Sequence, residues 1–351
     1  MHSKRSRTLR ELTPHTKLAM LLSAVLALMA GSACTGPVTV DQTGAEVELR
    51  ESPGRVLSAY GPATYFVYAL GEGDRIVAAR YVALTDPGGE VGALHQHMDP
   101  EFATKLMPTR PETEEILVHE PDLVLTNPNR NRGMADILRD LGVPAAEYVP
   151  ESVEGVLDAV ELTGELLGPE VKPRAEALVT ELEHHLAELD RAVGELSAEE
   201  RPRVLFVGTT PFHVASGDML QTELIARAGG RSVSAELGGG WREISLEQLT
   251  TWDPEVIVIA PYGNVGPTDL LDDPHWAWID AVRSGRVYKM PRIAAPWDAP
   301  VPDAVLGALW LAQVFHTDMA PLGVADEARV LYEEYYGISL PGEVLERLTV
   351  P

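Results

Sequence analysis

Residues 114–125 (EEILVHEPDLVL) and residues 247–258 (EQLTTWDPEVIV) align without a gap at a constant offset of 133. Nine of the twelve aligned pairs are identical or similar in residue type. Each copy has the pattern of a helix, a proline turn and a buried strand, so one supersecondary unit occurs twice. A polar loop follows each predicted strand, at 127–132 in the first copy and at 261–264 in the second. The chain is therefore expected to contain two similar halves.

Short apolar runs alternate with helical patterns on both sides of this repeat. The runs predicted as strands are 55–59, 75–79, 122–126, 145–149, 203–208, 255–260 and 286–290. The segments predicted as helices are 63–70, 114–119, 133–141, 220–228, 246–251, 276–282 and 303–315. This alternation favours an α/β fold with mainly parallel sheets. Ligands of open α/β sheets bind outside the carboxyl ends of the strands, so both polar loops are expected to face one cleft.

One long amphipathic helix is predicted between the halves, over residues 173–196. Its apolar positions recur every three or four residues, and its length is about 24 residues or roughly 36 Å. The predicted domains are an N-terminal lobe (51–168), a connecting helix (169–200) and a C-terminal lobe (201–351). His184 and His185 on this helix are expected to be solvated.

The composition excludes several classes of function. The chain has 351 residues, with 28 Lys and Arg against 53 Asp and Glu, which gives a formal charge of −25. A strongly acidic surface disfavours binding to nucleic acid or to anionic lipid. A single cysteine, Cys34, excludes an internal disulfide framework and a cysteine-rich metal cluster.

The N-terminus resembles a bacterial lipoprotein signal. Basic residues precede an apolar run at 18–30 that is too short to span a bilayer, and Gly31, Ser32 and Ala33 lead to Cys34. The resemblance implies a signal peptide (1–33), a lipid on Cys34, an anchor and linker (34–50), and a place outside the cytoplasmic membrane or in the periplasm. Gly31 stands where such signals usually carry Leu, and the alternative is an ordinary secretory signal.

Further segments resemble one family in their order and spacing. They are 56–65 (VLSAYGPATY), 69–77 (ALGEGDRIV), 216–224 (SGDMLQTEL), 245–254 (SLEQLTTWDP) and 284–288 (SGRVY). Over about residues 38–318 the chain resembles the substrate-binding lipoproteins of ABC importers for iron–siderophore, haem and cobalamin-type ligands. The resemblance implies two Rossmann-like lobes joined by one long helix. It also implies a monomer that docks on an ABC permease, catalyses no reaction and holds no covalently bound cofactor.

The resemblance assigns permease docking to Glu114 and Glu247, which hold equivalent places in the repeat. Exposed carboxylates suit an interface with a cationic partner. The alternative is that each glutamate complements the dipole of its own helix from the first turn.

Arginine and aromatic residues in the predicted strand-end loops are the candidate ligand contacts, together with three histidines. They are Tyr60, Arg80, Tyr81, His95, His97, Arg130, Arg132, His213, Trp241, Arg242, Tyr262, Arg292 and Trp297. Arginine binds oxyanions and carboxylates through two hydrogen bonds, and aromatic rings cover a planar chelate. The expected ligand is a ferric siderophore or similar metal chelate, with haem, a corrinoid or an oxyanion such as molybdate as alternatives. For each residue the alternative is a solvated loop side chain.

The segment His95-Gln-His97-Met-Asp99 permits a separate hypothesis. On an extended segment both imidazoles would lie on one side, with Asp99 as a third metal ligand. The segment partly resembles the His-x-His-x-Asp-His signature of metallo-β-lactamase-fold hydrolases, although Pro100 replaces the last histidine. The alternatives are a loop that faces a bound chelate, an ordinary surface loop and an extracytoplasmic metallo-hydrolase.

Overall fold

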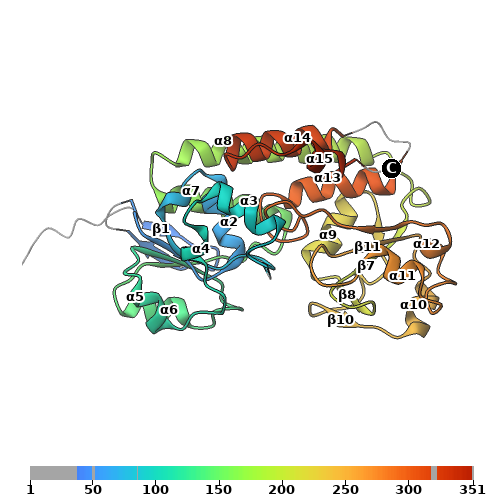
Figure 1. The fold of residues 1–351 in the computed structure, drawn as a ribbon, viewed down its shortest axis with the longest axis horizontal. Coiled ribbons are helices and arrows are strands. Elements are labelled where there is room, and N and C mark those ends of the chain that lie inside the picture. The colour runs from blue at the N-terminus through green and yellow to red at the C-terminus, as the bar shows by residue number, and fades with distance from the viewer. Residues whose placement is uncertain (1–37, 50–51, 85, 318–321, 350–351) are drawn as a thin grey trace, which may run out of the picture.

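The repeat forms the centre of two α/β lobes that lie side by side below one long helix (Figure 1). The computed structural model describes residues 38–49, 52–84, 86–317 and 322–349. The first copy forms α5 (Thr113–Val118) and β5 (Leu123–Thr126), and the second forms α10 (Leu246–Trp252) and β11 (Val256–Ile259). The first and last residues of β5 and β11 are 133 positions apart, as the sequence alignment predicts, so the repeat is confirmed.

The N-terminal lobe contains, within the described residues, a four-stranded parallel sheet in the order β4–β3–β5–β6. The other strands are β3 (Val56–Ser58), β4 (Ile76–Ala79) and β6 (Ala145–Glu147). Its helices are α2 (Gly61–Ala69), η1 (Gly73–Arg75), α3 (Glu90–Met98), α4 (Phe102–Lys105), α5, α6 (Met134–Asp140) and α7 (Val153–Leu167). Every residue of β3 and β5 is buried, as expected for parallel strands covered on both faces.

The C-terminal lobe contains a larger sheet. Its described strands follow the order β10–β8–β7–β11–β12, with β9 beside β7. Their bounds are β7 (Arg203–Val207), β8 (His213–Val214), β9 (Arg231–Ser232), β10 (Arg242–Glu243) and β12 (Val287–Lys289). The helices of this lobe are α9 (Leu220–Arg227), α10, α11 (Pro267–Leu271), α12 (Asp280–Arg283) and α13 (Ala304–Phe315). β7 pairs in parallel with β9 and β11, and β11 pairs in parallel with β12, whereas β8 is antiparallel to β7. The prediction of mainly parallel sheets is therefore confirmed.

The long connecting helix is α8 (Lys172–Val193), three residues shorter at its end than predicted. Its buried stripe includes Leu178, Leu182 and Leu189, and it packs against α7 and α13. After α13 the chain continues into α14 (Val324–Val330), a π-helical turn η2 (Leu331–Tyr335) and α15 (Gly342–Glu346). Figure 1 shows α14 running along the same edge of the molecule as α8.

Helix α7 is an element that the sequence analysis did not identify. Gly155 and Gly164 interrupt its pattern, and Gly164 is needed because a Cβ there would come within 2.5 Å of the Ala175 side chain on α8. The predicted helix at 276–282 is also wrong, since only α12 is helical in that region.

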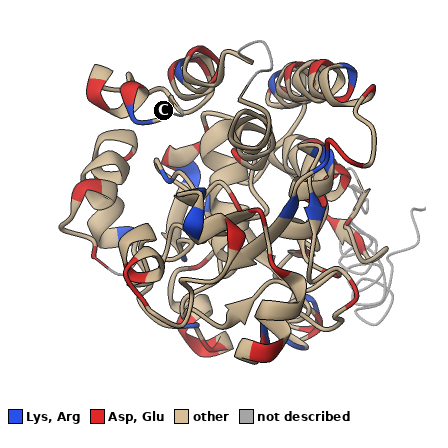
Figure 2. Cartoon of the chain, turned by 90° about the vertical axis from the view of Figure 1, so that its right-hand side faces the viewer, with Lys and Arg blue, Asp and Glu red and all other residues tan. Residues whose placement is uncertain are grey.

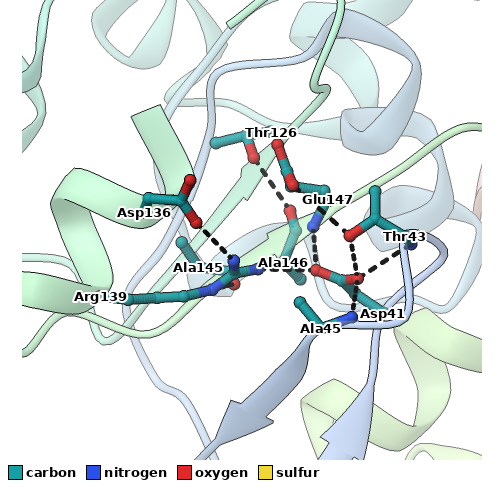
Figure 3. A network of polar contacts seen from close by, with 9 residues as sticks. All are labelled: Asp41, Thr43, Ala45, Thr126, Asp136, Arg139, Ala145, Ala146 and Glu147. Carbon is teal, nitrogen blue, oxygen red and sulfur yellow. Dashed lines mark hydrogen bonds and ion pairs between the residues drawn. The ribbon is translucent and has the colours of Figure 1, made fainter. Parts of the chain in front are cut away.

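Residues 38–49 are not a linker, which corrects the domain expectation for 34–50. They form a hairpin of β1 (Val38–Val40) and β2 (Glu46–Glu48) attached to the N-terminal lobe. Asp41 binds this hairpin to the lobe (Figure 3): its Oδ2 accepts hydrogen bonds from Arg139 Nη2 at 2.7 Å and from the Glu147 amide at 3.0 Å. Its Oδ1 accepts from the Thr43 and Ala45 amides and closes the turn. The buried Asp41 carboxylate therefore bonds to the hairpin turn through one oxygen and to the rest of the lobe through the other.

None of the helices found among the described residues combines the length and the apolar character needed to cross a membrane. Cys34 and the predicted signal peptide lie outside the described residues.

Candidate functional site

A cavity of about 430 Å³ lies between the two lobes, at the carboxyl ends of their parallel strands. The N-terminal lobe contributes Tyr60 after β3, Arg80 and Tyr81 after β4, Arg130 and Asn131 after β5, and Glu151 after β6. The C-terminal lobe contributes Gln221 at the start of α9, Trp241 before β10, Tyr262 after β11 and Asp298 after β12. The two sheets therefore present their strand-end loops to one cleft, as the fold class predicts.

Three arginines, Arg80, Arg110 and Arg130, line the cavity from the N-terminal lobe. Arg80 Nη1 donates a hydrogen bond to the carbonyl oxygen of Met107 at 3.1 Å. Burial, and then the charge of the neighbouring Arg110 guanidinium, lower the pKa of Arg80 from its ordinary value. Within the described part of the chain, no carboxylate oxygen lies within 4.0 Å of a guanidinium nitrogen of these three residues. The wall therefore carries cations without ion-pair partners.

The opposite wall carries a buried carboxylate. Asp298 is fully buried, and its Oδ2 accepts hydrogen bonds from Tyr262 Oη at 2.8 Å and from Gln221 Nε2 at 3.2 Å. Its Oδ1 has no hydrogen-bond partner among the described residues. Burial raises the pKa of Asp298 to about 6, although the two hydrogen bonds oppose this rise. Asp298 is therefore a group in the cleft wall that changes charge near neutral pH.

Aromatic rings and polar groups complete the cavity. Tyr60 is buried beside Glu151, and burial is the main cause that raises the pKa of its hydroxyl well above its ordinary value. The indole of Trp241 stacks on the imidazole of His213, with ring centroids 5.1 Å apart. The N-terminal wall thus combines three guanidinium groups with Tyr60, Tyr81 and Glu151. The C-terminal wall offers Trp241, Tyr262, the Gln221 amide and the Asp298 carboxyl group.

Arg292 and Trp297 do not line the cavity, which corrects their prediction as ligand contacts. Arg292 Nη1 instead donates to the carbonyl oxygen of Ala83 at 2.9 Å, and this bond joins the two lobes. Trp297 is fully buried in the core next to α13. The sequence placed both residues in a loop after a strand, but the chain folds inward there and 293–299 are all buried.

The hypothesis of a metal site at His95, His97 and Asp99 is wrong. These residues belong to or follow α3, so two positions two residues apart point to nearly opposite sides of a helix. His95 is fully buried and contacts Tyr65 Oη through Nε2 at 3.0 Å, whereas His97 is exposed. Asp99 forms an ion pair with Lys105 at 2.8 Å. Neither histidine lines the cavity.

Three other predicted contacts also lie away from the cavity. Arg132 is exposed and lies two residues after Arg130 in the same loop, outside the cavity. Arg242 is exposed, and its guanidinium bonds to the carbonyl oxygen of Gly238. His213 lies behind the indole of Trp241 and does not line the cavity.

Several lining residues were not predicted from the sequence, namely Arg110, Asn131, Glu151, Met219, Gln221 and Asp298. Two of them had a signal: Asn131 belongs to the polar loop after β5, and Glu151 follows the strand at 145–147. Arg110 follows no strand and lies between two prolines, so no pattern in the sequence marks it.

Glu114 and Glu247 are both exposed, each in the first turn of its helix, α5 and α10. Figure 1 shows these helices on the edge of the molecule opposite α8, one on each lobe. Figure 2 shows Asp and Glu positions spread over the outer helices on one side of the molecule, in keeping with the formal charge of −25.

Comparisons with known proteins agree with this geometry. A family described as "Periplasmic binding protein" matches residues 57–294. The molybdate-binding protein MolA of Haemophilus influenzae is 24% identical over 323 residues, which cover 85% of this chain and 90% of the relative. A vitamin B12-binding protein of Photorhabdus laumondii is 28% identical over 216 residues, or 60% of this chain and 72% of the relative. A periplasmic solute binding protein from Veillonella parvula has a similar structure, with a TM-score of 0.76, 24% identity and coverage of 89% of this chain and 96% of that one.

Proposed function

The chain belongs to the periplasmic binding protein family, and we propose that its cleft captures an anionic metal chelate such as a ferric siderophore. Proteins of this family are extracytoplasmic substrate-binding proteins of ABC transporters, and this chain is one of them. We propose that it holds the chelate between the lobes and releases it unchanged to the permease.

The observation that carries this proposal is the set of three cleft arginines that have no ion-pair partner among the described residues. Arg80, Arg110 and Arg130 line one cleft in a protein whose formal charge is −25. Two neighbouring guanidinium groups repel each other, so an anion bound between them relieves this repulsion. Carboxylate, catecholate or phosphate oxygens of a ligand are suited to this wall.

The size of the cavity and its aromatic side chains favour a ligand larger than a simple oxyanion. An anion of four oxygens occupies on the order of 100 Å³, if each oxygen fills about the volume of a water molecule. The cavity has about 430 Å³ and also offers Tyr60, Trp241 and Tyr262. These rings provide the flat apolar contact that the organic part of a chelate needs.

A free oxyanion is the second candidate. One relative, which covers 85% of this chain, is a molybdate-binding protein, and the three arginines suit such an anion equally well. A corrinoid is supported by the vitamin B12-binding relative, which covers a smaller part of the chain.

We also propose that the mature protein is attached to the membrane through a lipid on Cys34 and docks on the permease through Glu114 and Glu247. The support for the anchor is the apolar run at 18–30 followed by three small residues and the cysteine. The support for docking is that both glutamates are exposed on equivalent helices of the two lobes.

Isothermal titration of the purified protein with four ligand classes tests the proposed ligand. The panel contains ferric hydroxamate and ferric catecholate siderophores, haem, cobalamin, and molybdate. We expect a ferric siderophore to bind at least tenfold more tightly than molybdate or cobalamin. Tighter binding of molybdate would select the oxyanion alternative, and tight binding of neutral cobalamin alone would contradict the role given to the arginines.

A further inference from the structure

We propose that Glu181, His185 and Glu327 form a binding site for a divalent transition-metal ion of the Zn²⁺ type, remote from the ligand cleft. Glu181 and His185 are four residues apart on α8 and so share one face of that helix. Glu327 comes from the first turn of α14. One candidate ligand atom from each residue lies within 4.8 Å of the other two.

The distances are close to those of a metal site. His185 Nε2 lies 3.2 Å from Glu327 Oε2 and 3.9 Å from Glu181 Oε1. Tetrahedral coordination with bonds of about 2.0–2.1 Å separates ligand atoms by roughly 3.3 Å. Of the two histidine–glutamate pairs, one already has this spacing and the second needs a contraction of about half an ångström. The two carboxylate oxygens lie within 4.8 Å of each other, and rotation of the glutamate side chains can bring them closer.

The surroundings orient the three ligands. The sequence suggested that His185 is solvated, but only 8% of it is exposed, whereas its neighbour His184 points to solvent. Tyr335 Oη donates a hydrogen bond to Glu181 Oε2 at 3.0 Å, and this contact leaves Oε1 free to face the imidazole. The two carboxylates are partly exposed, at 30% and 28%, so a water molecule can complete the coordination. Such support of a ligand by a second hydrogen bond is a common feature of metal sites.

The donor set determines the class of ion. One imidazole and two carboxylates suit Zn²⁺ and its neighbours in the transition series, whereas Mg²⁺ prefers oxygen ligands in octahedral geometry. With a neutral imidazole the cluster carries two negative charges in an already acidic protein, so a divalent cation neutralises them.

A metal at this place would connect the helix between the lobes to the C-terminal segment. The same two segments already meet at Arg174, whose guanidinium lies 5.4 Å from the centre of the Tyr335 ring and donates to backbone oxygens of Glu334 and Tyr335. A metal bridge between α8 and α14 adds a constraint that the unfolded chain lacks, so binding stabilises the folded state.

Titration of Zn²⁺ into the full mature chain, prepared without a histidine tag and treated with a chelator, tests this site. We expect one Zn²⁺ per chain, a higher melting temperature with Zn²⁺, and no comparable effect of Mg²⁺. His185→Ala and Glu327→Gln should each weaken Zn²⁺ binding at least tenfold. His184→Ala removes a neighbouring exposed imidazole and should change the affinity by less than a factor of two.

Two results would overturn the site. One is that wild-type protein binds no more Zn²⁺ than His185→Ala does. The other is that His184→Ala loses as much affinity as His185→Ala. If His185→Ala does not fold, Glu327→Gln decides the question, because it keeps the size of the side chain on the second helix. Neither measurement depends on the ligand of the cleft.

Discussion

Tyr262 donates a hydrogen bond of 2.8 Å to Asp298, and this pair places an ionisable carboxyl group in the wall of the ligand cleft. The pKa of Asp298 is raised to about 6, mainly by burial. The carboxyl group is therefore mostly charged at pH 7.5 and mostly neutral at pH 5.5. A charged Asp298 repels an anionic ligand, whereas the neutral group can donate a hydrogen bond to it.

Binding of an anionic ligand should accordingly strengthen as the pH falls through about 6. For a ligand whose own charge is constant over this range, we expect the Kd at pH 5.5 to be about fivefold lower than at pH 7.5, which corresponds to roughly 1 kcal/mol. Asp298→Asn should remove most of this dependence and bind more tightly at pH 7.5. Weaker binding of the ligand at low pH would show that the carboxylate contacts a cationic part of it.

Neutralising the arginines of the cavity should weaken binding. A charge-assisted hydrogen bond contributes about 1.5–3 kcal/mol, so Arg110→Gln and Arg130→Gln should each raise the Kd by roughly 10- to 100-fold. Arg132→Gln is the matched control, because this exposed residue lies in the same loop as Arg130 but outside the cavity. Calorimetry with the tightest ligand of the panel gives the comparison. Equal effects at positions 130 and 132 would mean that general charge, and not contact, determines affinity.

The sequence predicted the repeated core well, because buried parallel strands have strong local signals. β5 and β11 consist only of buried apolar residues and Thr126, and each follows a proline turn. Elements that depend on tertiary contacts were missed. Helix α7 carries Gly164, which permits close packing on α8, and the hairpin at 38–49 is held by Asp41 through partners about a hundred residues away. Neither cause is visible in a local pattern.

The site was predicted in part, for the same reason. Tyr60, Arg80, Tyr81, Arg130, Trp241 and Tyr262 line the cavity, and all but Trp241 lie within four residues after the end of a parallel strand. Residues further along a loop were misplaced, because the direction of a loop depends on what it packs against. His95 is an example: the segment is helical, and its imidazole packs between the rings of Tyr81 and Phe102.

The buried His95 should make the protein sensitive to acid. Burial lowers the pKa of His95 to about 4, whereas an unfolded histidine titrates near pH 6.5. Between these values the unfolded chain binds more protons, so His95 costs stability as the pH falls from 6.5 to 4, by up to roughly 3 kcal/mol. Asp298 and Asp303, whose pKa values are raised to about 6, act in the opposite direction in an overlapping range.

The contribution of His95 is measured by comparing variants. Chemical unfolding between pH 7 and pH 4.5 should show a smaller loss, or a larger gain, of unfolding free energy in His95→Gln than in wild type. His97→Gln is the control, because this histidine lies on the same helix and is exposed. An identical pH dependence in wild type and His95→Gln would mean that the imidazole titrates normally in the folded state.

Replacing Cys34 should release the protein from the membrane. The thiol is the only one in the chain and follows a predicted signal sequence, so Cys34→Ala removes the sole site for a thioether-linked lipid. We expect the variant to move from the membrane fraction to the soluble extracytoplasmic fraction, with unchanged ligand affinity. Retention of Cys34→Ala in the membrane fraction would show that another part of the chain anchors it.

Glu114 and Glu247 should affect transport without affecting ligand binding. Both are exposed on helices at the edge opposite α8, and neither lines the cavity. Glu114→Lys or Glu247→Lys should therefore leave the Kd within a factor of two. Each removes a charge pair worth about 1 kcal/mol at the rim of the proposed interface and introduces a repulsive one, so uptake should fall, and fall further in the double variant. Glu183→Lys is the control, because it makes the same charge change at an exposed position of α8 on the other edge. Normal uptake by the double variant would mean that both glutamates only stabilise the first turns of α5 and α10. An equal loss of uptake with Glu183→Lys would indicate an effect of net charge alone.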